Sequence, residues 1–245
     1  MFPRFPFRKQ ALPAIALLVL GLTASAARAD QVFVANTNIA GTGHVNGQVT
    51  FQQSGSNLLQ ITLQNLQSTS NVGQAISGVQ FQIVDAQGNV LNLTGSITAQ
   101  NNALIQVGSN GSVTSLGTSA TGWGLTNTRS TFTLTGLGFR GNGTNPPDEL
   151  IVGTLNSANG SIAGNGPHNP FIDQSGTFSV TFSSNLPVGF QIRNVVLLFG
   201  TGPSSVPGVP TGIPEPATMF LLGTGLVGVA TRLRRKRAAT YQDKR

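Results

Sequence analysis

Apolar and polar side chains alternate in short runs between residues 30 and 200, and Gly, Asn and Ser separate these runs. Alternation with a period of two is typical of β-strands that bury one face. The clearest runs are residues 59–63, 79–83 and 178–182. The other runs lie at residues 32–34, 49–51, 90–93, 96–98, 103–107, 113–116, 123–125, 132–134, 150–152 and 192–199.

No segment between these runs has the spacing of an amphipathic helix. We therefore expect residues 30–200 to form a single all-β domain, with a β-sandwich or jelly-roll-like fold. Val32 and Val34 are expected to share one face of the first strand as its apolar stripe. A hairpin turn between two of the runs should place Gly88 or Asn89 at a positive φ.

Uncharged polar residues occupy the other face of these strands, as Gln60, Thr62 and Gln64 illustrate. Charged residues normally help to protect the edge strands of a sheet from pairing with other chains. Such protection is weak here, so uncovered edges could pair with other chains and support self-association. The alternative is that loops cover the edges and that the polar faces are simply solvated.

Two long segments, residues 138–148 and 156–173, interrupt the strand series and are rich in Gly, Asn and Pro. Loops of this length are either functional or lack a regular structure of their own. After the last run, residues 201–213 are rich in Pro, Gly and Ser. This composition predicts an extended linker that acts as a spacer.

The first 29 residues have the layout of a secretory signal peptide. Basic residues precede an apolar stretch at residues 11–22, and an A-x-A cleavage sequence follows with Ala27 and Ala29. We expect export through the Sec translocon and cleavage by signal peptidase, so that the mature protein begins at Asp30.

A second apolar stretch, residues 217–231, follows Pro214, Glu215 and Pro216 near the other end of the chain. As a helix it would be roughly 22 Å long, so it spans a hydrocarbon core of ~30 Å only if the flanking arginines snorkel or the bilayer thins. The positive-inside rule keeps the basic cluster, and the tail at residues 238–245, in the cytoplasm. The basic cluster comprises Arg232, Arg234, Arg235, Lys236 and Arg237.

The order of these features at residues 214–237 resembles the PEP-CTERM sorting signal of Gram-negative bacteria. The resemblance implies transient insertion in the inner membrane and processing by an exosortase-like membrane enzyme. It further implies that the protein ends at the cell surface or in the exopolysaccharide matrix of a biofilm. It says nothing of the chemistry of the β domain. The alternative, a basic stretch that binds nucleic acid, is disfavoured because an apolar segment adjoins it and no aromatic residues are interspersed.

The charge of the chain comes from its two ends. The whole chain has a formal net charge of +7 and no cysteine. Between residues 30 and 213, three arginines stand against five carboxylates, so this part is slightly acidic and is not suited to nucleic acid. Without disulfides its stability must come from a hydrophobic core, for which the segment is long enough.

Catalytic side chains are scarce. The two histidines are His44 and His168, and no serine lies in a G-x-S-x-G sequence. A Ser-His-Asp arrangement that uses His168 and Asp173 remains open; otherwise His168 is a loop histidine bonded to nearby backbone. Two isolated histidines match no zinc-binding spacing, and we expect no cofactor.

Three carboxylates and one aromatic residue complete the candidates. Asp148, Glu149 and Asp173 could bind calcium if the loops around them converge; the alternative is a solvated loop end. On a strand, Asp148 and Glu149 would point to opposite faces and could not act as a glycosidase pair. Trp123, between two glycines, could be an exposed platform that binds a sugar, with His168 as a second ligand-binding candidate, or it could belong to the core.

The first hypothesis from the sequence is therefore an exported, non-enzymatic protein of the cell surface or exopolysaccharide matrix. The second is a carbohydrate-binding β-sandwich module that uses Trp123 and the long loops. The third is a secreted hydrolase whose site is hidden among the loops.

Overall fold

The computed structural model describes residues 30–137, 149–202, 204–211 and 224–225. Residues Asp30–Ile213 form a compact unit that is built from β-strands, and the prediction of an all-β fold is confirmed. The predicted signal peptide and nearly all of the predicted membrane segment lie outside the described residues. Among the residues that are described, no helix is long and apolar enough to cross a membrane.

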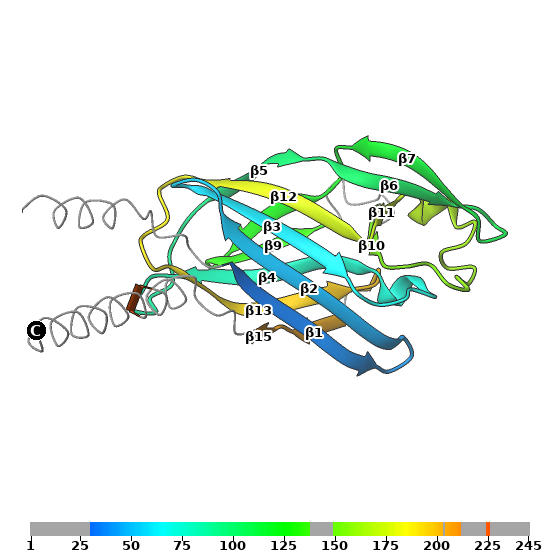
Figure 1. The fold of residues 1–245 in the computed structure, drawn as a ribbon, viewed down its shortest axis with the longest axis horizontal. Helices are drawn as coiled ribbons and strands as arrows, with labels where there is room; N and C mark the ends of the chain where they lie inside the picture. Colours follow the sequence, from blue (N-terminus) through cyan, green and yellow to red (C-terminus); the bar gives the residue numbers. More distant parts are fainter. Residues whose placement is uncertain (1–29, 138–148, 203, 212–223, 226–245) are drawn as a thin grey trace, which may run out of the picture. The chain divides into compact units, whose positions relative to one another are not determined.

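The first sheet has six strands in the order β15, β1, β2, β3, β12 and β5, and every neighbouring pair is antiparallel (Figure 1). β1 pairs with β2 in a regular register along its whole length. The strand bounds are Gln31–Ile39 for β1, Gly43–Gln53 for β2, Leu58–Asn65 for β3, Gly95–Gln100 for β5, Ser175–Phe182 for β12 and Val209–Thr211 for β15.

The second sheet has nine strands and follows the order β14, β13, β4, β10, β11, β6 and β7, with β9 paired to β4 and β8 paired to β9. β10 and β11 are parallel, and the other pairs are antiparallel. The bounds are Ile76–Val84 for β4, Asn102–Val107 for β6, Val113–Ser119 for β7, Gly124–Thr128 for β8, Thr131–Thr135 for β9, Ile151–Val152 for β10, Phe171–Asp173 for β11, Gln191–Phe199 for β13 and Ser204–Pro207 for β14. Two short 3₁₀ helices, η1 (Val72–Gln74) and η2 (Gly166–His168), lie in the loops.

Phenylalanine rings join the two sheets in the main core, the larger of two hydrophobic clusters. Phe51 of β2 lies 4.9 Å from Phe81 of β4, centroid to centroid, and Phe81 stacks on Phe132 of β9 at 5.3 Å. Phe132 contacts Phe182 of β12 edge-on at 5.4 Å, so this pair also connects the second sheet to the first. Such ring pairs add about 0.5–1.5 kcal/mol each to the stabilisation from buried area.

The apolar stripes of most strands face this core as the alternation predicts, but the stripe expected on β1 is wrong. Phe33 and Ala35 are buried, whereas Val32 and Val34 are only half-buried on the opposite face. The run is apolar on both faces, so its alternation cannot show which face turns inward. Packing decides, because the Phe33 ring meets Phe51 edge-on at 6.0 Å.

The predicted hairpin turn forms at residues 85–89, but the strand expected at residues 90–93 does not. Gly88 takes the positive φ, at 89°, and its N–H donates to the Asp85 carbonyl at 3.0 Å. Beyond the turn, pairing is limited to a single bridge between Val84 and Val90 and a hydrogen bond from Leu91 N to Ile83 O at 2.8 Å.

The interpretation of residues 201–213 as a spacer is also wrong for the residues that the structure describes there. Residues 204–207 form β14, which pairs with β13 in the second sheet. Residues 209–211 form β15, which pairs with β1 in the first sheet. Pro207 and Pro210 are compatible with these strands because both strands lie at a sheet edge, where a missing N–H is tolerated.

Two strands of the second sheet, β10 and β11, are buried on both faces. Ile151 of β10 and Ile172 of β11 face the main core, while their neighbours Leu150, Val152 and Phe171 face a second cluster. Burial on both faces is typical of parallel strands such as this pair. The second cluster consists of Ala75, Ile105, Val107, Leu150, Val152, Ile162 and Phe171.

Candidate functional site

Nearly all residues of the two predicted targeting signals lie outside the described residues. This holds for Ala27 and Ala29 at the predicted cleavage site and for Pro214, Glu215 and Pro216. It also holds for the basic cluster, Arg232, Arg234, Arg235, Lys236 and Arg237. These predictions therefore rest on the sequence.

Trp123 is not an exposed platform, so that interpretation is wrong and its alternative holds. The residue is 4% exposed, and its ring stacks on Phe178 at 4.8 Å between centroids. Its Nε1–H donates to the backbone oxygen of Glu149 at 2.9 Å. The indole is therefore part of the main core and has its polar group satisfied, as buried tryptophans generally do.

Glu149 is also buried, two residues before β10, and takes a positive φ of 62°. Its carboxylate accepts a hydrogen bond from the Gly122 N–H, and its own N–H donates to Pro170 O at 3.0 Å. Together with the Trp123 bond, these contacts join three loop segments. Glu149 therefore serves the structure here, and it does not lie on a strand.

The proposed calcium ligands are only partly described. Asp148 lies outside the described residues, and Asp173 is half-buried at the end of β11. No group of three or more His, Cys, Asp or Glu residues lies close enough to hold a metal ion in the described part of the chain.

His168 ends the short helix η2 and is half-buried. Its backbone N–H donates to Asn165 O at 3.1 Å, and its Nδ1 is buried with no hydrogen-bond partner among the described residues. A hollow of about 480 Å³ lies beside this loop, between Val107 and Gly108 of the β6–β7 hairpin and Gly166 and Asn169 of the loop. His168 does not line that hollow.

His44, on β2, is exposed and lies among amides. Its Nδ1 is 2.7 Å from Gln67 Oε1, and its Nε2 is 2.8 Å from Asn36 Oδ1. Neither ring nitrogen is bonded to a carboxylate or to a serine hydroxyl. The sequence pattern gave no indication of these partners.

The outer face of the first sheet carries rows of hydroxyl and carboxamide side chains. Thr62 Oγ1 lies 3.1 Å from Thr177 Oγ1, and Thr98 Oγ1 lies 3.0 Å from Thr181 Oγ1. The rows that cross β2, β3 and β12 are Gln48–Gln64–Ser175, Thr50–Thr62–Thr177 and Gln52–Gln60–Ser179. No member of these rows is charged, as the composition of the strands predicts.

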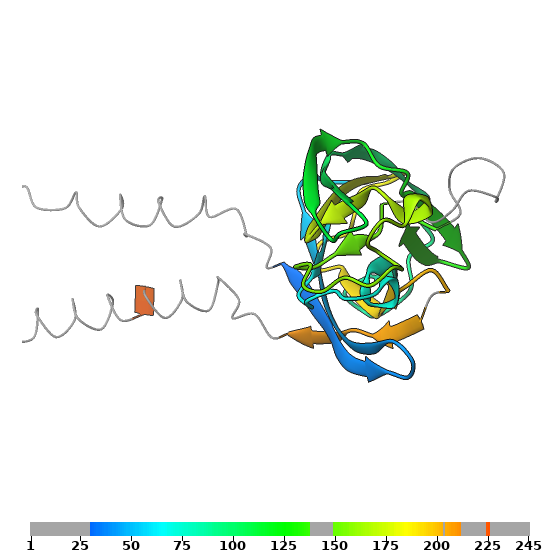
Figure 2. The ribbon, with the colours of Figure 1, turned by 90° about the vertical axis from the view of Figure 1, so that its right-hand side faces the viewer.

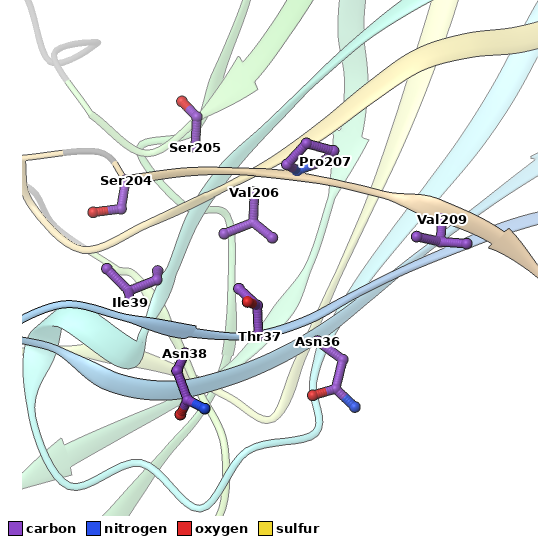
Figure 3. Close-up of a pocket in the computed structure, with 9 residues that line it drawn as sticks. All are labelled: Asn36, Thr37, Asn38, Ile39, Ser204, Ser205, Val206, Pro207 and Val209. Atoms are coloured by element: carbon purple, nitrogen blue, oxygen red, sulfur yellow. The ribbon is translucent and has the colours of Figure 1, made fainter.

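A groove of about 460 Å³ runs between the outer end of β1 and β14. In Figure 3 the side chains of Thr37 and Val206 point toward each other across it, while Asn36 and Asn38 point away from β14. The residues that line it are Asn36, Thr37, Asn38, Ile39, Ser204, Ser205, Val206, Pro207 and Val209. Sequence analysis missed this groove because it treated residues 201–213 as a spacer.

The carboxylate of Asp85 has an altered proton affinity. The pKa of Asp85 lies below its ordinary value because the Asn89 side chain donates to the carboxylate at 2.9 Å, and the Asn89 and Gln87 N–H groups donate as well. Asp85 lies in the tight hairpin turn, so these bonds stabilise the turn.

Comparison with known proteins identifies one feature. The family model of the PEP-CTERM protein-sorting motif matches residues 212–236. No curated protein and no solved structure matches the chain. The match covers the predicted proline-flanked motif, the apolar stretch and most of the basic cluster, and it does not extend into the β domain. The chain is therefore a protein that carries a PEP-CTERM sorting motif, which implies export and sorting by exosortase to the cell surface.

Proposed function

We propose that this chain is an exported, non-enzymatic protein of the cell surface or the exopolysaccharide matrix of a biofilm. In this proposal the Sec translocon exports it, signal peptidase releases it before Asp30, and an exosortase-like enzyme cuts near Pro214 to Pro216. The single observation that carries the proposal is the sorting motif at residues 212–236.

The β domain supports a structural role in two ways. Trp123, a candidate platform for sugar binding, and Glu149, a candidate calcium ligand, use their polar groups in contacts within the domain. His44 is bonded to the side-chain amides of Gln67 and Asn36. A catalytic histidine would instead be positioned beside a nucleophile or an orienting carboxylate.

The test is the intact mass of the protein recovered from cells, with surface, inner-membrane and culture-fluid fractions measured separately. We expect a species that begins at Asp30 and ends near residues 214–216, outside the inner membrane. A Glu215→Ala variant should accumulate in the inner membrane with its tail uncut, whereas Gln87→Ala, at an exposed residue far from the motif in sequence, should be cut normally. Unmodified protein that retains residues 234–245 in the inner membrane would overturn the proposal.

A second candidate function is contact with an uncharged polysaccharide through the outer face of the first sheet. The rows of Gln, Thr and Ser offer hydrogen-bond donors and acceptors at regular spacing, and no charged residue interrupts them. This candidate replaces the sugar site at Trp123, which the burial of that residue removes.

Binding of the exported protein to insoluble neutral polysaccharide, measured as the fraction depleted from solution, tests this second candidate. Gln60→Ala with Gln64→Ala should lower the bound fraction several-fold, because both side chains lie in the rows. The matched control is Gln87→Ala, which changes an exposed glutamine in the hairpin turn. Equal binding of the double variant and the control would exclude this face.

A further inference from the structure

The outer edge of β1 is covered along only part of its length. Among the described strands, β15 alone pairs with this edge, and it reaches only as far as Val34. In an antiparallel pair, alternate residues turn their backbone N–H and C=O groups to the same neighbour. Pro210 of β15 has no N–H and lies opposite Phe33, so Val32 and Val34 are the residues that can bond to β15.

The same alternation turns the backbone groups of Asn36 and Asn38 outward, beyond the end of β15. The hydrogen bond from Thr42 N to Ile39 O, at 3.1 Å, supports this assignment. It shows that the backbone groups of the odd-numbered residues of β1 turn toward β2. No backbone partner for Asn36 or Asn38 exists on the outer side in the described part of the chain. These groups therefore form an open strand edge along the groove shown in Figure 3.

β7 is the second open edge. Every residue from Val113 to Ser119 is exposed, and its described partner strand is β6 alone. Val107 of β6 turns away from β7, since its N–H donates to Asn169 Oδ1 at 2.7 Å and its C=O accepts from Gly164 N at 3.1 Å. The backbone N–H and C=O groups of its partner Val113 therefore turn outward, away from β6. Those of Ser115, two residues further on, do the same.

The two open edges have the same number of outward-facing residues at the same spacing. Asn36 and Asn38 on one edge, and Val113 and Ser115 on the other, each present outward groups at positions i and i+2. If Asn36 lies opposite Ser115 and Asn38 opposite Val113, both residue pairs can form reciprocal hydrogen bonds. Leu116 is the extra residue of a bulge in β7. In this pairing the bulge lies next to the part of β1 that β15 covers, and it bends β7 away from β15.

We propose that β7 of one copy of this chain pairs with the open edge of β1 in a second copy, within the groove between β1 and β14. Apolar side chains favour this pairing. Val113 and Leu116 of β7 are 50% and 51% exposed, and Val209 at the groove is 66% exposed. Pairing would remove part of this apolar surface from water.

The two open edges lie on different parts of the surface, so the contact is head to tail. β15, with β1 next to it, and β14 end the two sheets on one side, whereas β7 ends the second sheet at the other. Figures 1 and 2 both show β7 at the top of the domain and β1 with β15 at the bottom. A contact between different surfaces of identical chains repeats, and it produces open filaments unless the rotation closes a ring.

Charge does not oppose the contact. β1 and β7 contain no acidic or basic residue, and none lies between Asp85 and Arg129 in the sequence. Charged residues and proline are the usual protection of a strand edge, and they are absent from both of these strands. The inference goes beyond sorting, because it concerns the domain and not the route by which it is exported.

Two proline variants test the proposal in exported protein purified from cells that express the full-length gene. Ser115→Pro blocks the β7 edge, and Asn38→Pro blocks the β1 edge. Each removes an outward N–H and leaves the bonds to the neighbouring strand in place. Sedimentation velocity over a hundredfold concentration range should show growing assemblies for the unmodified chain and a monomer for each variant alone.

An equimolar mixture of the two variants should form a dimer and nothing larger, because each copy retains the edge that the other lacks. The lysine variants Val113→Lys and Val209→Lys repeat the test without changing the backbone, and should weaken association at least tenfold. Val188→Lys, on a loop outside both edges, is the matched control. Monomeric unmodified protein at every concentration, assembly of either proline variant alone, or a mixture that stays monomeric would overturn the proposal.

Discussion

The two hydrophobic clusters of the β domain are built in different ways. The main core lies between two sheets, and alternate residues of long strands contribute its side chains. The second cluster lies on the other face of β6, β10 and β11, and residues of the 156–173 segment, such as Ile162 and Phe171, contribute to it. A second sheet covers the first cluster, whereas loop residues take part in covering the second.

This difference determines where polar side chains are needed. Strands satisfy their own backbone groups in the ladders, but a loop that packs on a core must find other partners. Asn159 Oδ1 accepts from Ser161 N at 2.9 Å, and Asn165 Nδ2 donates to Ser161 O at 3.1 Å. The buried Asn65 amide also donates to Gln74 O at 2.9 Å and to Ile151 O at 3.0 Å. Amide side chains therefore satisfy backbone groups of the loop that packs on the second cluster.

The largest effect should come from the main core. Phe81→Ala removes a ring that contacts Phe51 and Phe132, and we expect it to lower the free energy of unfolding by about 3–5 kcal/mol. Urea denaturation followed by fluorescence of the buried Trp123 measures this loss. Phe81→Leu, which refills most of the space, should cost clearly less. Equal losses for the two variants would show that ring contacts do not hold the sheets together.

A glycine beside the second cluster should be nearly as sensitive. A Cβ on Gly153 would overlap the backbone oxygen of Gln67, so Gly153→Ala should cost about 3 kcal/mol or more. Gly160 has nothing within 4 Å of its Cβ position, and Gly160→Ala should change stability by less than about 1 kcal/mol. Thermal unfolding of both variants makes the comparison, and similar Tm values for the two would contradict the close approach.

The amide bonds of the loop should have a smaller effect that is confined to one region. Asn169 Oδ1 accepts from Val107 N at 2.7 Å, and its Nδ2 donates to Asn165 O at 2.9 Å. Asn169→Ala should cost about 1–3 kcal/mol, because Val107 N–H loses its partner. Hydrogen exchange should quicken at residues 156–170 before it quickens in β2 or β4. Asn127→Ala, on β8, provides a control outside the second cluster. Uniform acceleration across the domain in Asn169→Ala would show that the cluster does not open separately.

The smallest effect concerns pH. Because the Asn89 bonds hold the pKa of Asp85 below its ordinary value, the carboxylate stabilises the fold above the unfolded-state pKa of about 3.9. This contribution is lost as the pH falls through the lower, folded-state pKa. Asp85→Asn should therefore lower Tm slightly at about pH 7 and show a smaller deficit at about pH 2. A deficit of the same size at both pH values would indicate that charge is not involved.

The sequence alone predicted those features for which a single physical rule was sufficient. The period-two stripes at residues 59–63, 79–83 and 178–182 became β3, β4 and β12 with their apolar side chains buried. The order of proline motif, apolar stretch and basic cluster indicated the sorting motif that the family comparison finds at residues 212–236. Both patterns are local, so distant residues were not needed to recognise them.

The sequence alone was not sufficient where the same residues could adopt more than one arrangement or bury either face of a strand. Residues 204–207 and 209–211 are extended in either case, and only pairing with β13 and β1 makes them β14 and β15. On β1, Val32 with Val34 and Phe33 with Ala35 are equally good apolar stripes in the sequence. The contact between Phe33 and Phe51 shows which of the two faces is buried. Trp123 could be assigned to the core only after Phe178 and Glu149 were brought to it from distant strands and loops.

The sequence by itself therefore determined the secondary-structure class, the uncharged character of the strands and the sorting motif, because periodicity, composition and short linear motifs are properties of the chain alone. Only the tertiary structure decided which face of β1 is buried, what Trp123 and Glu149 contact, and which strand edges remain open. Those outcomes depend on contacts between residues far apart in sequence. A strand edge is open or covered according to what the rest of the fold places beside it.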